Sequence, residues 1–166
     1  MEPKGVVDDK VLEELIGDLI GRGSARLVYK MKNDSCCVIK AGCTSPYASN
    51  KTEWTIWQEI SESKFASLFG ECFAISTSHH YLVMEYLESL AETDTAPIPP
   101  TPVWLTDRKP SAFGKASNGA IKVRDYSQVR DCIDRANAPT QPWPSEAETL
   151  SMADIMAGLN KIQDDG

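Results

Sequence analysis

The chain has 166 residues, of which 42% are hydrophobic and 25% are charged, a length that suits one packed domain better than two. The net charge of −7 argues against nucleic acid or an anionic membrane as the main partner, because both are bound through clustered Lys and Arg. No apolar run approaches the roughly 20 residues of a membrane span, and the polar first ten residues are unlike a signal peptide. We therefore expect one cytoplasmic domain.

Cysteines and histidines give no sign of a metal or catalytic centre. The five cysteines are an odd number without a C-x-x-C pair, which favours neither a disulfide framework nor a zinc site. His79 and His80 are the only histidines and lie in a polar stretch between two apolar runs. This position is typical of a hairpin tip, so His-based catalysis has little material here.

The first half of the chain alternates strand patterns with one helix. Residues 11–17 have helical spacing and predict either a short helix or the approach to the first strand. Residues 19–29 predict a strand, a Gly-rich turn and a second strand, and residues 36–41 predict a third strand of the same antiparallel sheet. Residues 68–76 and 81–87 predict two more strands. Together these patterns indicate a five-stranded sheet.

A helix is expected over residues 50–61, between the third and fourth of these strands. Asn50 suits the N-cap and Glu53 suits the third helical position, which is the arrangement of a capping box. The apolar side of this helix consists of Trp54, Ile56, Trp57 and Ile60.

Regular patterns are weaker in the second half of the chain. Residues 88–104 are Pro-rich and lack helical periodicity, which predicts an extended connector with local polyproline II character. Residues 105–135 regain short apolar runs, and Asn118–Gly119 between two of them predicts a hairpin turn. Residues 136–166 begin as a Pro-rich linker and end in an apolar stripe at helical spacing, which predicts a C-terminal amphipathic helix.

Four short motifs succeed one another in the chain order of a protein-kinase ATP site. They are I-G-R-G-S-A-R-L-V-Y-K at residues 20–30, C-V-I-K ending at Lys40, T-D-R-K-P-S-A-F-G at residues 106–114 and I-K-V-R-D-Y-S around Asp125. With the E-W-x-x-W pattern of the expected helix, they resemble the protein-kinase-like superfamily over about residues 11–130. The sequence is most similar to small kinase-like proteins of bacteriophage and bacterial genomes.

The resemblance implies an α+β fold with a heavily truncated large lobe. Residues 1–87 would form the kinase-like small lobe, a five-stranded antiparallel sheet with one helix, and residues 88–104 would be a Pro-rich connector. Residues 105–135 would be a minimal catalytic-loop and metal-loop segment. Residues 136–166 would add the linker and the C-terminal helix.

The resemblance also implies ATP and magnesium as ligands and assigns roles in a nucleotide site. Lys40 would hold the α- and β-phosphates, with Glu53 of the helix as its partner. Glu59 is the rival partner and lies on a different side of the helix, so only one of the two can face the lysine. Arg26 replaces the third glycine of the loop and could add a phosphate contact. The nucleotide-binding residues implied are Gly21, Gly23, Ser24, Lys40, Glu53, Glu85 and Leu87.

Two aspartates and a lysine would carry the chemistry. In the resemblance Asp107 is the catalytic aspartate, Lys109 steadies the transferred phosphate and Asp125 binds magnesium. The family pattern has a second metal-binding residue, an Asn, five positions after the catalytic aspartate. That position is Ala112, whose methyl group cannot coordinate a metal. We expect Ala112 to border a solvent-filled cleft.

This pattern is compatible with two functions. Loss of the Asn favours a degenerate kinase, or pseudokinase, that acts as a binding or regulatory module through its sheet or its C-terminal helix. Retention of Lys40, Asp107, Lys109 and Asp125 favours a minimal ATP phosphotransferase that uses one magnesium. Self-association that completes the truncated lobe, as a homo-oligomer, is compatible with either function.

Overall fold

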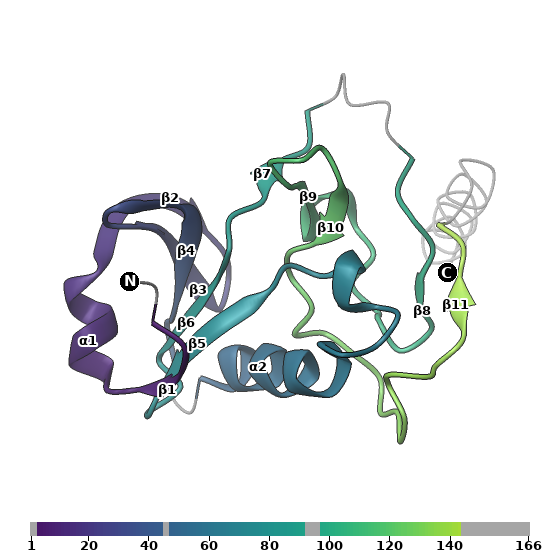
Figure 1. Ribbon diagram of the computed structural model, residues 1–166, viewed down its shortest axis with the longest axis horizontal. Coiled ribbons are helices and arrows are strands. Elements are labelled where there is room, and N and C mark those ends of the chain that lie inside the picture. The colour runs from purple at the N-terminus through teal and green to yellow at the C-terminus, as the bar shows by residue number, and fades with distance from the viewer. Residues whose placement is uncertain (1–2, 45–46, 92–96, 144–166) are drawn as a thin grey trace, which may run out of the picture.

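The computed structural model describes residues 3–44, 47–91 and 97–143, and the fold is α+β (Figure 1). A six-stranded sheet with two α-helices is followed by a region of short strands and loops, residues 97–143, on the right of Figure 1. Within the described residues, no helix is long and apolar enough to cross a membrane. The expected C-terminal helix lies outside the described residues.

The main sheet has the strand order β1-β5-β6-β4-β3-β2. Its pairs are antiparallel except for β1 and β5, which run parallel. The prediction of five strands is therefore wrong by one, because the three residues of β1 are too few to show a period in the sequence. The strands are β1 (Gly5–Val7), β2 (Ile16–Arg22), β3 (Arg26–Met31), β4 (Asp34–Gly42), β5 (Cys72–Ser76) and β6 (Tyr81–Glu85).

Strand β4 is buried on both faces, and its alternating side chains separate two hydrophobic clusters. Val38 packs in the larger cluster with α2 (Ala48–Ile60), and Lys40 lies on the same face. Ile39 packs in the smaller cluster, to which α1 (Asp9–Glu14) contributes Leu12. The two helices thus cover opposite faces of the sheet.

Helix α2 begins earlier than the sequence predicts, after Tyr47 in a left-handed conformation with φ of 56°. Asn50 is not the N-cap, because it lies inside the first turn and is fully buried. Its Nδ2 donates to the carbonyl oxygens of Lys40 at 3.1 Å, His79 at 3.1 Å and His80 at 2.7 Å. The capping box is therefore wrong: Asn50 ties the helix to β4 and to the β5–β6 hairpin.

The second region contains only short elements. The Asn118–Gly119 turn is confirmed, since β9 and β10 pair around it and Gly119 has φ of 85°. The expected connector carries the two-residue strands β7 and β8, and Leu68, expected in a strand, ends the 3₁₀ helix η1. The elements within residues 97–143 are β8 (Thr101–Pro102), η2 (Pro110–Ala112), β9 (Phe113–Lys115), β10 (Ile121–Val123) and β11 (Thr140–Gln141), and two short elements precede them, η1 (Ala66–Leu68) and β7 (Glu88–Ser89).

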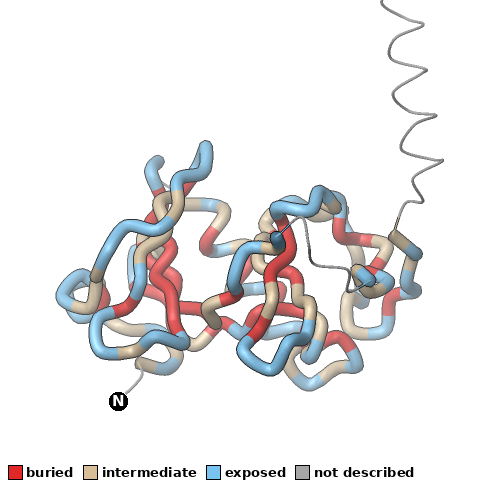
Figure 2. Tube along the Cα trace, turned by 90° about the horizontal axis from the view of Figure 1, so that it is seen from above, coloured by how far each residue is buried: buried red, intermediate tan, exposed pale blue. Residues whose placement is uncertain are grey.

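Aromatic side chains join this region to the sheet. Phe69, which precedes β5, stacks on Trp104 with 5.5 Å between ring centroids and meets the edge of Tyr126 at 5.0 Å. All three rings are buried in the cluster that also contains Ile56 of α2. Buried stretches of the chain lie in both regions (Figure 2). Residues 97–143 are therefore packed against the sheet region.

Candidate functional site

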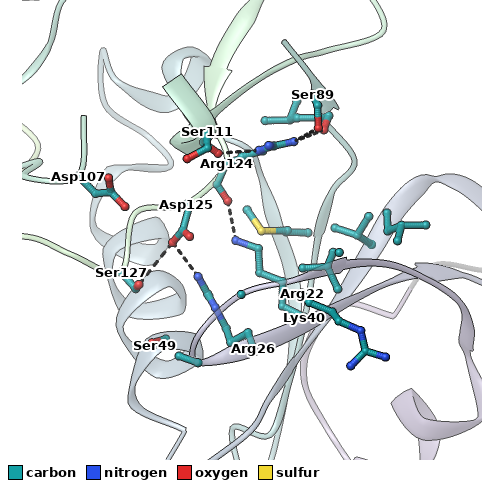
Figure 3. A pocket seen from close by; sticks show the side chains of 18 of the residues that line it. Arg22, Arg26, Lys40, Ser49, Ser89, Asp107, Ser111, Arg124, Asp125 and Ser127 are labelled. Carbon is teal, nitrogen blue, oxygen red and sulfur yellow. Dashed lines mark hydrogen bonds and ion pairs between the residues drawn. The ribbon is translucent and has the colours of Figure 1, made fainter. Parts of the chain in front are cut away.

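A cleft with a volume of about 540 Å³ lies where the sheet meets residues 97–143 (Figure 3). The end of β2 and the turn that follows it line one side, including Gly21, Gly23 and Ser24. The loops that carry Asp107 and Asp125 line the other side. The cleft thus gathers residues that are far apart in the sequence.

The predicted ion pair between Lys40 and Glu53 is confirmed. Lys40 Nζ lies 3.0 Å from Glu53 Oε2 and 3.2 Å from Oε1, and it also donates to the carbonyl oxygen of Arg124 at 2.5 Å. Burial lowers the pKa of Lys40, and the charge of Glu53 opposes that shift. Glu59, the rival partner, pairs instead with Arg135 at 2.6 Å.

Arg26 makes contacts in the site that the sequence did not reveal. Its guanidinium binds Glu53 with two hydrogen bonds, Nη1 to Oε2 at 2.6 Å and Nη2 to Oε1 at 3.1 Å. Nη2 also lies 2.7 Å from Asp125 Oδ1 (Figure 3). Burial alone would lower the pKa of Arg26, but Glu53 and Asp125 raise it. This side chain, which in the resemblance could add a phosphate contact, is buried and bound to two carboxylates.

Asp125 follows β10 and presents its carboxylate to the cleft, with 41% of the side chain exposed. Partial burial would raise the pKa of Asp125, but the charges of Lys40 and Arg26 lower it to about 2. Ser127 Oγ lies 3.4 Å from the same oxygen that Arg26 binds. Asp125 is consequently a charged side chain held by a neighbouring cation.

Asp107 and Lys109 form an ion pair of 3.0 Å on the loop before η2. The Asp107 side chain is only 8% exposed, whereas that of Lys109 is 60% exposed. Both residues line the same cleft as Asp125 and the turn at Gly23. Asp107 and Asp125, which the resemblance assigns to one nucleotide site, thus line one cleft together with the Gly-rich turn.

Glu85 and Leu87 also line the cleft, at its apolar wall. Glu85 pairs with Lys122 at 2.8 Å, so its charge is offset within the protein. This wall gives the cleft a surface on which a flat, weakly polar group could pack. Its apolar residues are Ile20, Val28, Val38, Met84 and Leu87.

The expectation that Ala112 borders the cleft is wrong. It is fully buried in the main hydrophobic cluster, at the end of η2, while its neighbour Ser111 lines the cleft. Its carbonyl oxygen accepts from the backbone N–H groups of Arg124 at 2.8 Å and Asp125 at 3.3 Å. The short helix turns the Ala112 side chain into the core, which the five-residue spacing could not indicate.

The side chains of the cleft leave few oxygen atoms for a magnesium ion. Asp125 already uses one oxygen for Arg26, and Ala112 supplies no oxygen ligand from its side chain. Across residues 3–44, 47–91 and 97–143, no group of three or more His, Cys, Asp or Glu side chains is placed to hold a metal ion. The positive charge next to Asp125 belongs to the guanidinium of Arg26.

Comparison with known proteins gives no family for this chain: no protein-family model and no curated protein matches it. The evidence for its function therefore comes from the cleft itself.

Proposed function

We propose that the protein is a kinase-like pseudokinase that binds a nucleotide in this cleft and acts as a binding or regulatory module. The observation that carries the proposal is the shared cleft: the Lys40–Glu53 pair, the turn at Gly23, Asp107 and Asp125 surround one space. Their order in the chain is the order of a kinase ATP site.

The size and lining of the cleft support a nucleotide. A volume of about 540 Å³ lies in the ordinary range for small-molecule sites, roughly 300–1,000 Å³. The apolar wall around Val28 and Leu87 suits a nucleobase, and Lys109, on the loop that carries Asp107, offers a cation for the phosphates. This division of apolar and charged lining is what an amphipathic ligand such as ATP requires.

Two features favour binding over phosphate transfer. Asp125 is bound to Arg26 at 2.7 Å, and Ala112 offers no second metal ligand. Kinase catalysis depends on metal ions that bridge the β- and γ-phosphates, and these contacts leave little for such ions to bind.

A thermal-shift titration with ATP and ADP tests the proposal. A ligand that binds the native state at 100 times its Kd stabilises it by about 2.7 kcal/mol, so the melting temperature must rise. Val28→Trp would fill the apolar wall and should abolish the shift. Val6→Trp is the control, because Val6 is 64% exposed on β1 and does not line the cleft. A shift that survives in Val28→Trp would place the nucleotide elsewhere.

A minimal phosphotransferase is the second candidate, favoured by the buried Asp107 carboxylate and its Lys109 partner in the same cleft. We expect ATP turnover at background for the natural protein. Turnover above background that Asp125→Ala removes would establish the phosphotransferase instead.

A further inference from the structure

We propose that this protein binds uncomplexed nucleoside di- or triphosphates without a metal ion, because Arg26 offsets the charge of Asp125 that a metal would otherwise offset. The inference rests on the proposed nucleotide site and specifies its ligand. It also explains how a charged aspartate can remain in a cleft whose side chains leave few oxygen atoms for magnesium.

The charges beneath the cleft balance without any added ion. Arg26 and Lys40 are the two cations, and Glu53 and Asp125 are the two anions, all joined by contacts of 3.2 Å or less. An unpaired Asp125 would repel a phosphate, and in a kinase the metal removes that repulsion. Here the guanidinium is already 2.7 Å from the carboxylate.

A metal ion would have to compete with this guanidinium. Arg26 is 7% exposed, so a metal that took Asp125 from it would leave part of a buried cation without its partner. The planar fork of Arg26 also binds both oxygens of Glu53, which fixes its orientation toward Asp125. The Arg26–Asp125 pair therefore resists replacement of the guanidinium by a metal ion.

The phosphates would meet Lys109 on the open side of the cleft. Arg124 is engaged, with Nη1 donating to Ser89 Oγ at 2.9 Å and Nε to the carbonyl oxygen of Ser111 at 3.1 Å (Figure 3). Arg22 points away from Asp125 in the same view. The Lys109 side chain is 60% exposed and lines the cleft, so it can turn from Asp107 toward an anion.

Calorimetric titration of the natural protein with ATP, once in EDTA and once with excess magnesium, tests the inference directly. We expect the two dissociation constants to agree within about threefold, or the EDTA value to be lower. An affinity that rises about tenfold or more with magnesium would overturn the inference and leave the nucleotide site standing. If ATP and ADP bind under neither condition, the proposed function fails and the inference fails with it.

A pair of variants at Arg26 isolates the guanidinium. Arg26→Met removes the charge and frees Asp125, so the affinity in EDTA should fall by about tenfold and magnesium should restore it. Arg26→Lys keeps a cation and should keep binding independent of magnesium. Arg130→Met is the control for losing one positive charge, because Arg130 is exposed and does not line the cleft. Equal magnesium responses in Arg26→Met and Arg130→Met would contradict the inference.

Asp125→Asn keeps the test decisive if Arg26→Met does not fold. With the carboxylate gone, the charge of Arg26 is unbalanced, so the affinity for ATP in EDTA should rise and magnesium should not increase it further. A metal-binding Asp125 predicts the opposite result, a loss of affinity that appears only with magnesium. That loss would overturn the inference.

Discussion

The six-stranded sheet and residues 97–143 are held together in different ways. The sheet consists of strands of three to nine residues that pair along their length, with a helix on each face. Strands in residues 97–143 have two or three residues, and this region is positioned by buried rings such as Trp104 and Tyr126. Backbone hydrogen bonds between its strands hold the sheet together. Residues 97–143 instead fold against the surface that the sheet provides.

Polar contacts join the two regions at the cleft. Glu53 Oε1 accepts from the backbone N–H of Tyr126 at 2.9 Å, Lys40 donates to the carbonyl oxygen of Arg124, and Arg26 binds Asp125. The same side chains form the proposed site. Substitutions that weaken these contacts should therefore weaken the packing of residues 97–143 against the sheet.

The largest effect is expected for Glu53→Ala. Glu53 is fully buried, and its loss leaves Arg26 and Lys40 as buried cations without their shared partner. Removing one partner of a buried ion pair costs about 3–5 kcal/mol, which urea denaturation would measure as a fall in the free energy of unfolding. Glu59→Ala is the control, because the Glu59 pair with Arg135 is partly exposed and should contribute about 0–1 kcal/mol. Equal losses in both variants would contradict the prediction.

Ala112→Asn should have the next largest effect. The side chain at this position is fully buried in the main cluster, so the larger amide must both displace neighbours and lose its water. We expect a loss of about 1–3 kcal/mol in the free energy of unfolding. Ser111→Asn, on the neighbouring exposed residue, should stay within about 0.5 kcal/mol. An unchanged free energy of unfolding in Ala112→Asn would mean that this position borders solvent.

Tyr126→Phe should have a smaller effect. The Tyr126 hydroxyl contacts Cys72 Sγ at 2.9 Å and donates to the carbonyl oxygen of Gly70 at 2.9 Å, so it ties residues 97–143 to the start of β5. Its removal should cost about 1 kcal/mol, read from the urea midpoint. Tyr29→Phe in the half-buried position on β3 is the comparison. The prediction fails if Tyr29→Phe costs as much as Tyr126→Phe.

The smallest expected effect is on acid stability. The pKa of Asp125 is lowered from 3.8 to about 2 in the folded protein, so its ionised form stabilises the fold at pH values above 3.8. That stabilisation is lost as the pH falls from 3.8 toward 2. Asp125→Asn should therefore flatten the dependence of the free energy of unfolding on pH in this interval, and urea denaturation at several pH values would measure it. The change should be modest because the side chain is 41% exposed.

The sequence predicted the sheet region well because its strands are long enough to show a period. The three strands within residues 16–42 are six to nine residues long, and the Lys40–Glu53 pair could be placed from strand and helix positions. Strand β1 could not be predicted, because three residues carry no period and its partner β5 is distant in the sequence.

The contacts at the site that the sequence did not reveal share a physical cause. Asn50, Arg26 and Ala112 were interpreted by local rules of capping, loop composition and spacing. Tertiary contacts determine all three: Asn50 binds distant carbonyl oxygens, Arg26 binds Glu53 and Asp125, and Ala112 packs into the core. Local patterns contain no information about partners that only the complete fold supplies.

The parallel pairing of β1 with β5 has a consequence for the order of folding. Strands β2, β3 and β4 are consecutive antiparallel neighbours, and they can pair through short turns as soon as they collapse. Strand β1 can pair only after residues 74–76 of β5 are in place, since its backbone partners lie there. Closing so long a loop costs entropy before any contact is gained. We therefore expect the N-terminal edge of the sheet to form late in folding, although it comes first in the sequence.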